Sequence, residues 1–430
     1  MIKLAIVSLG CDKNRIDTER MLYSLKDDVV VTEDYSEAEV IVINTCAFIE
    51  SAREESINTI LEMAEYKKTG NCKKLIVTGC LPQRYLYEVK DELPEVDVFL
   101  GVNDYEKINE AVTGIEKAYS LCPPRGTIQG RIITTPPHYA YLKIADGCDN
   151  FCTYCMIPSI RGRYRSTPME DLVKEASILV RNGAKELILV AQDVTRYGAD
   201  LYGRPSLVEL IRELSKLDVT WIRLMYCYPE LVTDELIDEI ANNDKVAKYI
   251  DIPLQHVDDN ILRLMNRKST FHSINVVLDK LKEKNIAVRT TLMVGFPGET
   301  EESFDKLLKF VRTRKLRHVG VFTYSDEEVP AAKLSDKVDE YTKQKRAAAI
   351  AHAHKRNVEH FNKAQIGKVL KVIYEEIDFD KNLFVGRSED CAPDIDTCVY
   401  FKAGFADVGN FYNIEIKSYD GYDLIGEIKQ

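Results

Sequence analysis

The sequence contains no run of about 18 apolar residues, which is the length that a membrane-spanning helix requires. It shows no signal peptide either, because a strand-like pattern begins at its start, Met1 to Leu4. Positive charge is in deficit: 58 Lys and Arg stand against 69 Asp and Glu, a formal net charge of −11. We therefore expect a cytoplasmic protein that does not bind membranes. Broad binding of nucleic acid is disfavoured, because it depends on basic side chains that neutralise phosphates.

Cysteine, in contrast, is plentiful, with 11 residues. Disulfides are rare in the cytoplasm, so metal ligation or catalysis is the preferred interpretation of these thiols. The remaining composition, with 45% apolar and 30% charged residues, is that of an ordinary globular protein. The spacing of the cysteines must therefore distinguish structural thiols from a metal site.

The length and the hydrophobic pattern divide the chain into domains. One hydrophobic core rarely grows beyond about 250–300 residues, so this chain of 430 residues predicts two or three domains. Residues 1–116 alternate short apolar segments with helical patterns, which predicts an α/β domain with a parallel sheet covered by helices. The expected strands are Lys3–Leu9, Val40–Asn44, Lys74–Thr78 and Val96–Leu100, and the expected helices are Asp17–Leu25, Ser51–Tyr66 and Gln83–Asp91.

A linker of residues 117–133 is expected before a second α/β region, residues 134–364. Six strand–helix units predict a partial (β/α)6 barrel, an open version of the eight-unit barrel, with its chemistry at the carboxyl ends of the strands. Ser166 and Thr167 are expected to cap a helix that has Pro168 at its first position. The six strands are expected to centre on Ile144, Leu189, Arg223, Asp251, Thr291 and Val321.

The last part of the chain changes character twice. Residues 340–363 predict a helix rich in Ala, with six basic and two acidic residues. Residues 366–430 contain short alternating segments with turns at 380–382, 409–410 and 420–421, which predicts a small antiparallel β-barrel.

Three cysteines, Cys148, Cys152 and Cys155, lie within eight residues, directly after the first expected barrel strand. Three thiolates cannot complete a tetrahedral zinc site, but they can bind three irons of a 4Fe–4S cluster and leave the fourth iron open. This CxxxCxxC spacing, with the aromatic residue Tyr154 before the last cysteine, resembles the radical S-adenosylmethionine superfamily. The resemblance implies that the open iron binds the amino and carboxylate groups of S-adenosylmethionine. A zinc knuckle, or thiols without a ligand, is the alternative.

The same resemblance implies that other strand ends contact the cofactor. Tyr154 is expected at the cofactor site, Gln192 and Asp193 near the methionine part of S-adenosylmethionine, and Arg289 and Gly295 near its adenosine. Turn formation and sheet packing are the competing roles for these residues.

A second group of cysteines is dispersed in the sequence but shares one position. Cys11, Cys46 and Cys80 each come at or just after the carboxyl end of an apolar segment. In an open parallel sheet these ends meet along one crevice, where ligands bind. We interpret the group as the ligands of a second cluster, with buried structural thiols as the alternative. The other cysteines have no such placement, and Cys391 and Cys398 have the spacing of a weak metal pair without a nearby partner in sequence.

Two three-cysteine groups followed by a small C-terminal barrel are similar to the radical S-adenosylmethionine methylthiotransferases, which end in a TRAM domain. The resemblance covers essentially the whole chain. Within this family the sequence resembles the branch that modifies a ribosomal protein. The segments that carry this closer similarity are Gly10–Asn14, Asp17–Glu19, Ile157–Arg165, Tyr226–Glu230, Asp251–His256 and Ala392–Asp396. Thr18, Thr167 and Val194 depart from the commoner choices of that branch, but none is an expected ligand.

The resemblance implies two 4Fe–4S clusters and S-adenosylmethionine as cofactors. One S-adenosylmethionine is expected to methylate a sulfur held at the first site. A second is expected to yield the radical that removes a hydrogen from the β-carbon of an aspartate in the small-subunit ribosomal protein numbered twelve. The implied partners are this basic protein, free or on the ribosome, a reductant such as flavodoxin or ferredoxin, and a sulfur donor. The residue that positions the substrate aspartate stays unassigned.

Charge gives a further expectation about the substrate. Residues 367–430 contain 7 Lys and Arg against 13 Asp and Glu, which favours a basic protein over RNA. Asp394 and Asp396 are expected to be exposed and to contact it, unless they only hold their turn. Arg161, Arg163 and Arg165 are candidates to pair with the substrate aspartate or a cofactor carboxylate, or else are surface charges. The basic helix 340–363 is a candidate contact for ribosomal RNA.

Two other functions stay open at this point. The nearer alternative is a methylthiotransferase that acts on adenosine in tRNA. The more distant one is a non-catalytic iron–sulfur electron carrier or RNA-binding protein, although such a carrier needs neither an open iron nor a six-unit barrel.

Overall fold

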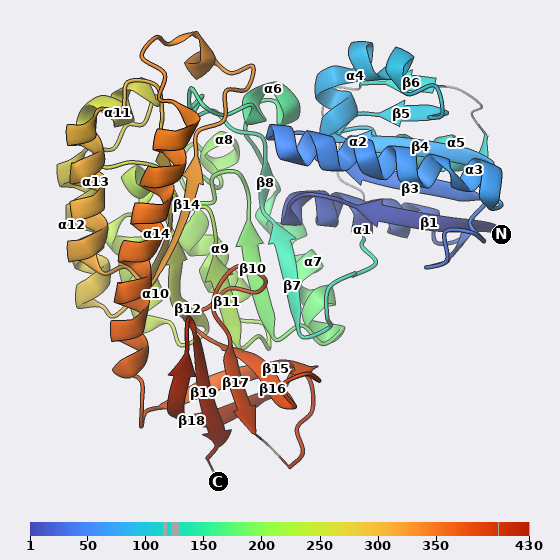
Figure 1. The fold of residues 1–430 in the computed structure, drawn as a ribbon. Coiled ribbons are helices and arrows are strands. Elements are labelled where there is room, and N and C mark those ends of the chain that lie inside the picture. The colour runs from blue at the N-terminus through green and yellow to red at the C-terminus, as the bar shows by residue number, and fades with distance from the viewer. Residues whose placement is uncertain (115–117, 122–129, 403, 430) are drawn as a thin grey trace. The chain divides into compact units, whose positions relative to one another are not determined.

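The computed structural model describes residues 1–114, 118–121, 130–402 and 404–429, and the chain divides into two compact units (Figure 1). The first unit is Met1–Thr134 with the segments 146–149 and 155–165. The second unit is 135–145, 150–154 and 166–430. Much of the expected linker, residue 117 and residues 122–129, lies outside the described residues. Within the described residues, no helix combines the length and the apolar character that a membrane span needs.

The first unit is built on a six-stranded parallel sheet with the strand order β2-β1-β3-β4-β5-β6. The four expected strands are present, and two three-residue strands were not expected. The elements are β1 (Ile2–Ser8), α1 (Asp12–Leu25), β2 (Val29–Val31), β3 (Val40–Thr45), α2 (Glu50–Ala64), α3 (Tyr66–Thr69), β4 (Lys74–Gly79), α4 (Cys80–Glu92), β5 (Val98–Leu100), η1 (Tyr105–Lys107), α5 (Ile108–Thr113), β6 (Ala118–Ser120) and, from later in the chain, α6 (Ile157–Arg161).

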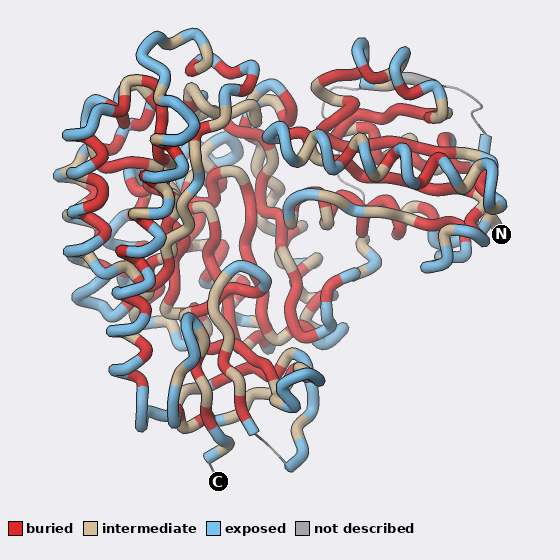
Figure 2. The backbone as a smooth tube through the Cα atoms, in the orientation of Figure 1, coloured by how far each residue is buried: buried red, intermediate tan, exposed pale blue. Residues whose placement is uncertain are grey.

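Both faces of this sheet are buried, because successive strand residues point to opposite sides. Val40 and Val42 of β3 face one side, where α1 and α5 pack. Ile41 and Ile43 face the other side, where α2 and α4 pack together with Ile160 of α6. The tube in Figure 2 is accordingly buried along the strands, while the helices alternate between buried and exposed residues.

The second unit contains an open six-stranded parallel sheet with the order β14-β13-β12-β11-β10-β7, so that consecutive barrel strands are neighbours. This is the expected partial (β/α)6 barrel. Its elements are β7 (Tyr139–Lys143), β8 (Ala145–Asp146), β9 (Arg165–Ser166), α7 (Met169–Arg181), β10 (Glu186–Val190), α8 (Ala199–Tyr202), α9 (Leu207–Leu214), β11 (Trp221–Leu224), η2 (Pro229–Leu231), α10 (Asp234–Asn242), β12 (Val246–Asp251), α11 (Asp259–Leu264), α12 (Phe271–Glu283), β13 (Ala287–Val294), α13 (Glu301–Arg314), β14 (His318–Thr323), η3 (Pro330–Lys333) and α14 (Glu340–Lys363).

Two details of this barrel differ from expectation. The first strand ends at Lys143, so Ile144 follows it instead of lying at its centre. Helix α7 begins at Met169, and Pro168 is the capping residue with φ −53° and ψ 140°. The expected caps Ser166 and Thr167 therefore lie outside the helix. Pro168 takes the cap position because its fixed φ also fits extended backbone.

The chain ends in the expected small closed barrel, with the strand order β15-β16-β17-β19-β18. Its strands pair antiparallel, except that β17 pairs with β19 in parallel. It belongs to the same compact unit as the (β/α)6 barrel. Glu186, the first residue of β10, accepts hydrogen bonds from Arg223 of β11 at 2.5 Å and from Arg387 of β16 at 2.6 Å. Trp221 packs edge-on against Phe411. The strands are β15 (Val369–Asp378), β16 (Leu383–Ser388), β17 (Val399–Lys402), β18 (Phe411–Asp420) and β19 (Asp423–Ile428).

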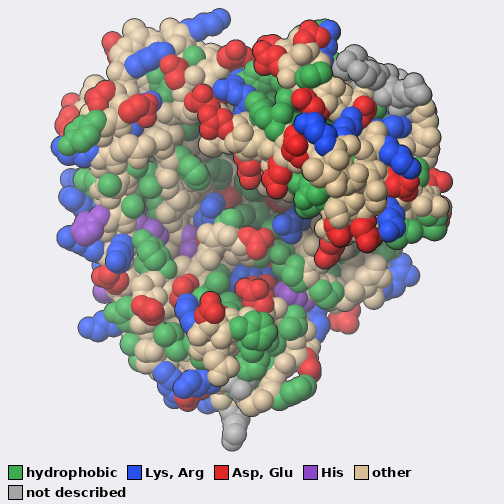
Figure 3. Space-filling view, turned by 45° about the vertical axis from the view of Figure 1, so that its right-hand side comes forward, with side chains coloured by type: hydrophobic (Ala, Val, Ile, Leu, Met, Phe, Trp, Pro, Cys, Tyr) green, Lys and Arg blue, Asp and Glu red, His purple; other side chains and the backbone are tan. Residues whose placement is uncertain are grey.

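The surface carries charges of both signs. On the face shown in Figure 3, Lys and Arg side chains are interspersed with Asp and Glu side chains and do not form one large basic patch. This distribution agrees with the weakly acidic composition of the chain.

Candidate metal centres

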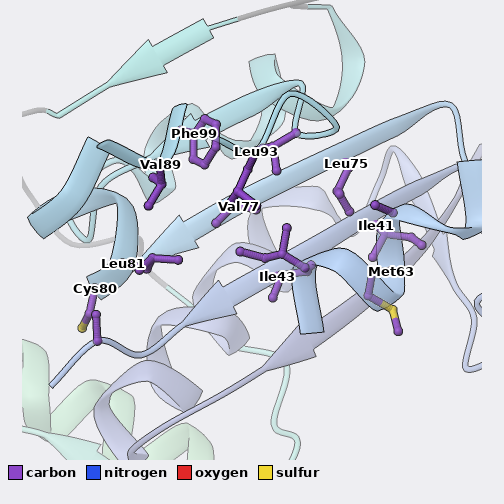
Figure 4. Packing of buried hydrophobic residues seen from close by; sticks show 14 of the residues in the cluster. Ile41, Ile43, Met63, Leu75, Val77, Cys80, Leu81, Val89, Leu93 and Phe99 are labelled. Atoms are coloured by element: carbon purple, nitrogen blue, oxygen red, sulfur yellow. The ribbon is translucent and has the colours of Figure 1, made fainter. Parts of the chain in front are cut away.

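The first unit brings Cys11, Cys46 and Cys80 to one edge of its sheet. Cys11 precedes α1, Cys46 follows β3, and Cys80 is the first residue of α4 directly after β4. Because β1, β3 and β4 are neighbours in the sheet, their carboxyl ends lie side by side. Figure 4 shows Cys80 at the border of the apolar cluster, beyond Leu81 and the end of the strand that carries Val77. The thiols thus lie where the sheet core ends.

Glycines allow the backbone to approach these thiols closely. Gly10 has φ +86°, and a Cβ there would lie 2.8 Å from Cys46 Cβ and 3.1 Å from Cys46 Sγ. Gly79 has φ +99°, and a Cβ there would lie 2.4 Å from Asn44 Oδ1. A side chain at either position would collide with this edge, so the Gly-Cys pairs are required by the local packing.

Asn14, on the first turn of α1, connects the loops that carry the thiols. Its Nδ2 donates to the carbonyl of Leu9 at 3.1 Å and to that of Thr45 at 3.0 Å. Its Oδ1 lies 3.9 Å from Cys80 Sγ and accepts from Arg161 at 2.7 Å. One buried amide therefore fixes the approach to all three cysteines.

The donor set fits a metal bound by thiolates. Burial raises the pKa of the Cys80 thiol to about 12, and it also raises the pKa of Cys46. Arg161 opposes both shifts with its positive charge. Such thiols stay protonated at neutral pH unless a metal replaces the proton, since coordinated thiols are deprotonated. Three thiols at one edge of the sheet, beside a buried cation, suit an anionic iron–sulfur cluster with one open iron.

The CxxxCxxC segment is divided between the two units. Cys148 and Cys155 belong to segments that pack in the first unit, whereas Cys152 belongs to 150–154, which packs in the second. In the first unit, the Cys148 amide donates to the carbonyl of Gly162 at 3.1 Å. A Cβ on Gly147 would lie 2.1 Å from the Arg163 carbonyl, so the two passes of the chain touch at this glycine. The segment after Cys155 therefore supports the one that carries Cys148.

The second unit supplies the surroundings of Cys152. Its Sγ lies 3.6 Å from the hydroxyl of Tyr228, and the guanidinium of Arg267 stacks 4.2 Å from the centre of the Tyr228 ring. Asp193, at the end of β10, is fully buried and accepts from Asn150 at 2.9 Å. Asp193 thus holds the cysteine loop, which is a supporting role in this structure.

The remaining residues expected at the cofactor have different surroundings. Tyr154 is half-buried. The Oε1 of Gln192 is buried and has no hydrogen-bond partner within the described residues. Gly295 has φ +74°, and a Cβ there would lie 2.3 Å from Lys343 Cγ, so this glycine admits helix α14. Arg289 forms ion pairs with Asp251 at 3.0 Å and with Asp396 at 3.4 Å, and its contact with the adenosine stays a prediction.

The three arginines after the cysteines do not act alike. Arg161 is 2% exposed and contacts Asp17, Asp146 and Asn14, so it is not the surface charge considered above. Arg163 is exposed and pairs with Asp149 at 2.8 Å. Arg165 donates to the backbone carbonyls of Arg161 and Arg163. The sequence analysis expected Arg161 near a cluster. It included Asn14 and Asp17 in segments that resemble the family, but it gave neither residue a role at the site.

The expected exposure of the two C-terminal aspartates is half correct. Asp394 is exposed, with φ +66°. The side chain of Asp396 is 2% exposed, and its Oδ2 accepts from the Tyr249 hydroxyl at 2.8 Å and from the Ala392 amide at 2.9 Å. The expectation is therefore wrong for Asp396, because it fastens its turn to the barrel strand that carries Tyr249.

Cys391 gains neighbours that its sequence position did not indicate. It lies with His318 and Asp390 in one buried group whose ligand atoms are within 4.8 Å of one another. Asp390 is already paired with Arg317 at 2.8 Å, and His318 Nε2 bonds the Asp390 backbone at 2.7 Å. We assign this group to packing between the two barrels.

Comparison with known proteins agrees with this architecture. The chain matches the radical SAM superfamily over residues 142–311, the uncharacterized protein family UPF0004 over 3–101 and the TRAM domain over 366–428. Among solved structures, it is similar to the radical S-adenosylmethionine methyltransferase TsrM from Kitasatospora setae. That similarity has a TM-score of 0.56 and 12% identity, over 75% of this chain and 73% of that chain. The cobalamin-dependent radical enzyme OxsB gives a TM-score of 0.52 and 11% identity, over 91% of this chain and 65% of that chain. At these identities the similarity concerns the fold alone.

Curated relatives are much more similar. A protein of Clostridium botulinum (strain Loch Maree / Type A3) is 48% identical over 438 aligned residues, which cover 99% of this chain and 98% of the relative. Proteins of Clostridium tetani and Clostridium perfringens have the same identity and coverage. Each is named ribosomal protein uS12 methylthiotransferase RimO.

The fold and these relatives together define a radical SAM methylthiotransferase, an enzyme that uses S-adenosylmethionine and a 4Fe–4S cluster. More closely, the chain belongs to the family of ribosomal protein uS12 methylthiotransferases, RimO.

Proposed function

We propose that this enzyme adds a methylthio group to the β-carbon of an aspartate in ribosomal protein uS12. We also propose that it uses a second 4Fe–4S cluster held by Cys11, Cys46 and Cys80. The observation that supports the second cluster most strongly is the position of these three thiols after neighbouring strands, at the edge of the sheet where Asn14 and Arg161 are buried. The relatives that share 48% identity carry the uS12 methylthiotransferase name.

The cofactors supply the radical and the transferred sulfur, while the protein binds and aligns them. Cys148, Cys152 and Cys155 are proposed to bind three irons of the radical cluster and to leave one iron for S-adenosylmethionine. Asp193 orients this loop through Asn150, and Tyr228 borders Cys152. Gln192 keeps an unpaired amide oxygen at the carboxyl end of β10, where it can accept a hydrogen bond from the amino group of the cofactor.

The substrate is proposed to be a basic protein surface. The C-terminal barrel carries 7 basic and 13 acidic residues from 367 to 430, and Asp394 is exposed on it. Opposite charges steer encounter and fix register more than they add affinity. Arg163 stays a candidate contact for the substrate because its side chain is 76% exposed. Arg165 is a weaker candidate, since it already donates to two backbone carbonyls.

A contact with ribosomal RNA is also proposed, through helix α14. Lys343 and Arg346 of this helix are buried against the barrel and do not contribute. The exposed basic residues that remain are Lys345, Lys355, Arg356 and Lys363. Such a patch suits phosphate contacts on an assembled small subunit, and it would make binding sensitive to salt. A reductant and a sulfur donor complete the proposed partners.

Intact-mass analysis tests the substrate. The reconstituted enzyme, with S-adenosylmethionine, sulfide and a reductant, is incubated with free uS12, with small ribosomal subunits and with unmodified tRNA. We expect uS12 to gain the mass of a methylthio group in place of one hydrogen. Modification of adenosine in tRNA, with uS12 unchanged in both forms, would instead favour the tRNA-modifying alternative.

A further inference from the structure

Arg161 is a buried charge whose place in the fold is unusual. It ends helix α6, six residues after Cys155, and its side chain is 2% exposed inside the first unit. Removing a guanidinium from water is costly unless charged and hydrogen-bonded partners replace the water. The partners that Arg161 has gained therefore indicate what the residue does.

Those partners belong to two different stretches of the chain. Nη1 lies 3.1 Å from Asp17 Oδ2 and 3.1 Å from Asp146 Oδ2, while Nη2 donates to Asn14 Oδ1 at 2.7 Å. Asn14 and Asp17 are on α1, which begins directly after Cys11. Asp146 lies two residues before Cys148. The guanidinium of Arg161 thus joins α1, the helix that follows Cys11, to β8, the strand that precedes Cys148.

Arg161 also supplies positive charge at the N-terminal thiols. Its partner Asn14 Oδ1 lies 3.9 Å from Cys80 Sγ, so the guanidinium is separated from this thiol by one amide oxygen. The same guanidinium also pairs with two carboxylates, Asp17 and Asp146.

We infer that Arg161 is a positioning residue for sulfur insertion: it fixes the segment that carries Cys148 against the helix that follows Cys11, and it places a buried positive charge beside the N-terminal thiols. This inference rests on the proposed function, since it requires a cluster at Cys11, Cys46 and Cys80. The positional half follows from the need to hold reacting groups at a fixed separation. The electrostatic half follows from Coulomb attraction, which is strong where water is excluded.

The electrostatic half predicts a change in redox potential. A cluster bound by three thiolates is anionic, and reduction adds one more negative charge. A nearby cation therefore stabilises the reduced form, and its removal lowers the midpoint potential. Lys at position 161 keeps the positive charge. Its single ammonium nitrogen cannot reproduce the planar arrangement of N–H groups with which the guanidinium contacts Asn14, Asp17 and Asp146. Arg161→Met and Arg161→Lys consequently separate charge from geometry.

The first experiment uses the full chain with Cys148, Cys152 and Cys155 changed to Ala, so that only the N-terminal site is loaded. Iron content and midpoint potential are measured for this parent, for Arg161→Met, for Arg161→Lys and for Arg131→Met. Arg131 is a matched control because it forms a buried ion pair, at 2.6 Å, with Glu19 of α1, the helix that also carries the Arg161 partners Asn14 and Asp17. We expect Arg161→Met to lower the ratio of reduced to oxidised cluster at a given potential at least tenfold. For one electron, this corresponds to a midpoint potential lower by about 59 mV. The other two variants should stay close to the parent.

Each other outcome has a definite meaning. A parent without iron at this site would refute the proposed second cluster and not the inference alone. An unchanged potential in Arg161→Met would overturn the electrostatic half. Loss of iron from Arg161→Met with retention in Arg161→Lys would support it. Equal loss of iron from all three variants would overturn it, because the ion pairs would then act on folding only.

The second experiment tests position in the enzyme with all six cysteines intact. The ratio of 5′-deoxyadenosine to methylthiolated uS12 is measured for the parent, Arg161→Lys and Arg131→Met. We expect Arg161→Lys to raise this ratio severalfold, because radical formation continues while sulfur insertion loses its alignment. The Arg131 variant should keep the parent ratio. If Arg161→Lys gave the same ratio of 5′-deoxyadenosine to methylthiolated uS12 as the parent, the inference that Arg161 positions the Cys148 segment for sulfur insertion would be overturned.

Discussion

Arg289 and Asp396 form an ion pair, Nε to Oδ1 at 3.4 Å, between strand β13 of the parallel barrel and the loop before β17 of the C-terminal barrel. Asp251 binds the same guanidinium at 3.0 Å. Arg289, which was expected near the adenosine, and Asp396, which was expected to contact the substrate protein, thus bind each other. The C-terminal barrel is consequently part of the support of the radical SAM barrel, as well as a candidate surface for the substrate.

Asp396→Asn should destabilise the second unit. The amide oxygen of Asn can still accept from the Tyr249 hydroxyl and the Ala392 amide, but the side chain loses the charge that pairs with Arg289. Arg289 keeps Asp251 as one counter-charge but loses the other, which costs on the order of 1–3 kcal/mol. Thermal unfolding of the unloaded protein should therefore show a lower Tm for this variant.

Asp394→Asn is the matched control for that change. Asp394 is exposed and has φ +66°, a conformation that Asn tolerates well. Its Tm should equal that of the parent, while its affinity for uS12 at low salt should fall. Equal Tm values for Asp396→Asn and the parent would show that the buried pair contributes no net stability. Unchanged affinity in Asp394→Asn would remove this carboxylate from substrate binding.

Glu186 should make stability depend on acidity. Burial by itself raises the pKa of Glu186, but the ion pairs with Arg223 and Arg387 outweigh it and hold the pKa below its ordinary value. A carboxylate with a lowered pKa stabilises the fold above its unfolded pKa of about 4.3 and loses that contribution as pH falls through the folded value. Glu186→Gln should cost about 3–5 kcal/mol near neutral pH, because the buried guanidinium of Arg223 loses its carboxylate partner and that of Arg387 keeps only Glu375.

The measurement is Tm as a function of pH for the parent and Glu186→Gln. The difference between them should be largest above about pH 4.3 and should shrink in more acidic solution. Glu415→Gln is a suitable control, since Glu415 pairs with Lys417 on the surface of the C-terminal barrel. A difference that grows as pH falls would contradict the assignment of an ionised Glu186.

Gly10→Ala should empty the N-terminal site. A Cβ at this position would lie 3.1 Å from Cys46 Sγ and 2.8 Å from Cys46 Cβ, so the thiol must move. Iron content of the reconstituted protein should fall from about eight to about four per chain, the content of one 4Fe–4S cluster. Gly203→Ala controls for backbone strain, because Gly203 also has a positive φ, +73°, but no atom within 4 Å of its Cβ position. Equal iron loss in both variants would attribute the effect to strain and not to Cys46.

The two cysteine groups should have separable roles. Changing Cys148, Cys152 or Cys155 to Ala should abolish 5′-deoxyadenosine formation, because the electron enters S-adenosylmethionine through that cluster. Changing Cys11, Cys46 or Cys80 should preserve 5′-deoxyadenosine formation and abolish methylthiolation of uS12. Anaerobic assays with dithionite measure both products. If the second set of variants lost all cofactor cleavage while its radical cluster stayed intact, this division of roles would be wrong.

The fold was predictable wherever the hydrophobic pattern of a segment matches the burial of that segment in the folded protein. The boundaries of α14 follow from its composition, and β3 and β4 follow from continuous apolar segments that are buried on both faces. Strands β2 and β6 were missed because three residues carry too little periodicity to stand out. Their pairing with β1 and β5 comes from the sheet and not from their own sequence.

The candidate site was predictable in its cysteines and not in what surrounds them. Thiols after three strands point to one edge whatever the packing around them is. Arg161 and Asp396 each have an ion-pair partner more than a hundred residues away, at Asp17 and Arg289 respectively. No local pattern marks a buried arginine or a buried aspartate, because the same residue types serve most often on the surface.

The two segments that flank Cys152 belong to the first compact unit although the chain reaches them only after the barrel has begun. A continuous fragment that contains the (β/α)6 barrel therefore also contains segments that pack in the first unit. A fragment of residues 134–364 would leave Ile160 without its apolar neighbours and Arg161 without Asn14 and Asp17. During synthesis, the first unit cannot complete its packing until the segment 155–165 has been made, because that segment carries its last helix, α6.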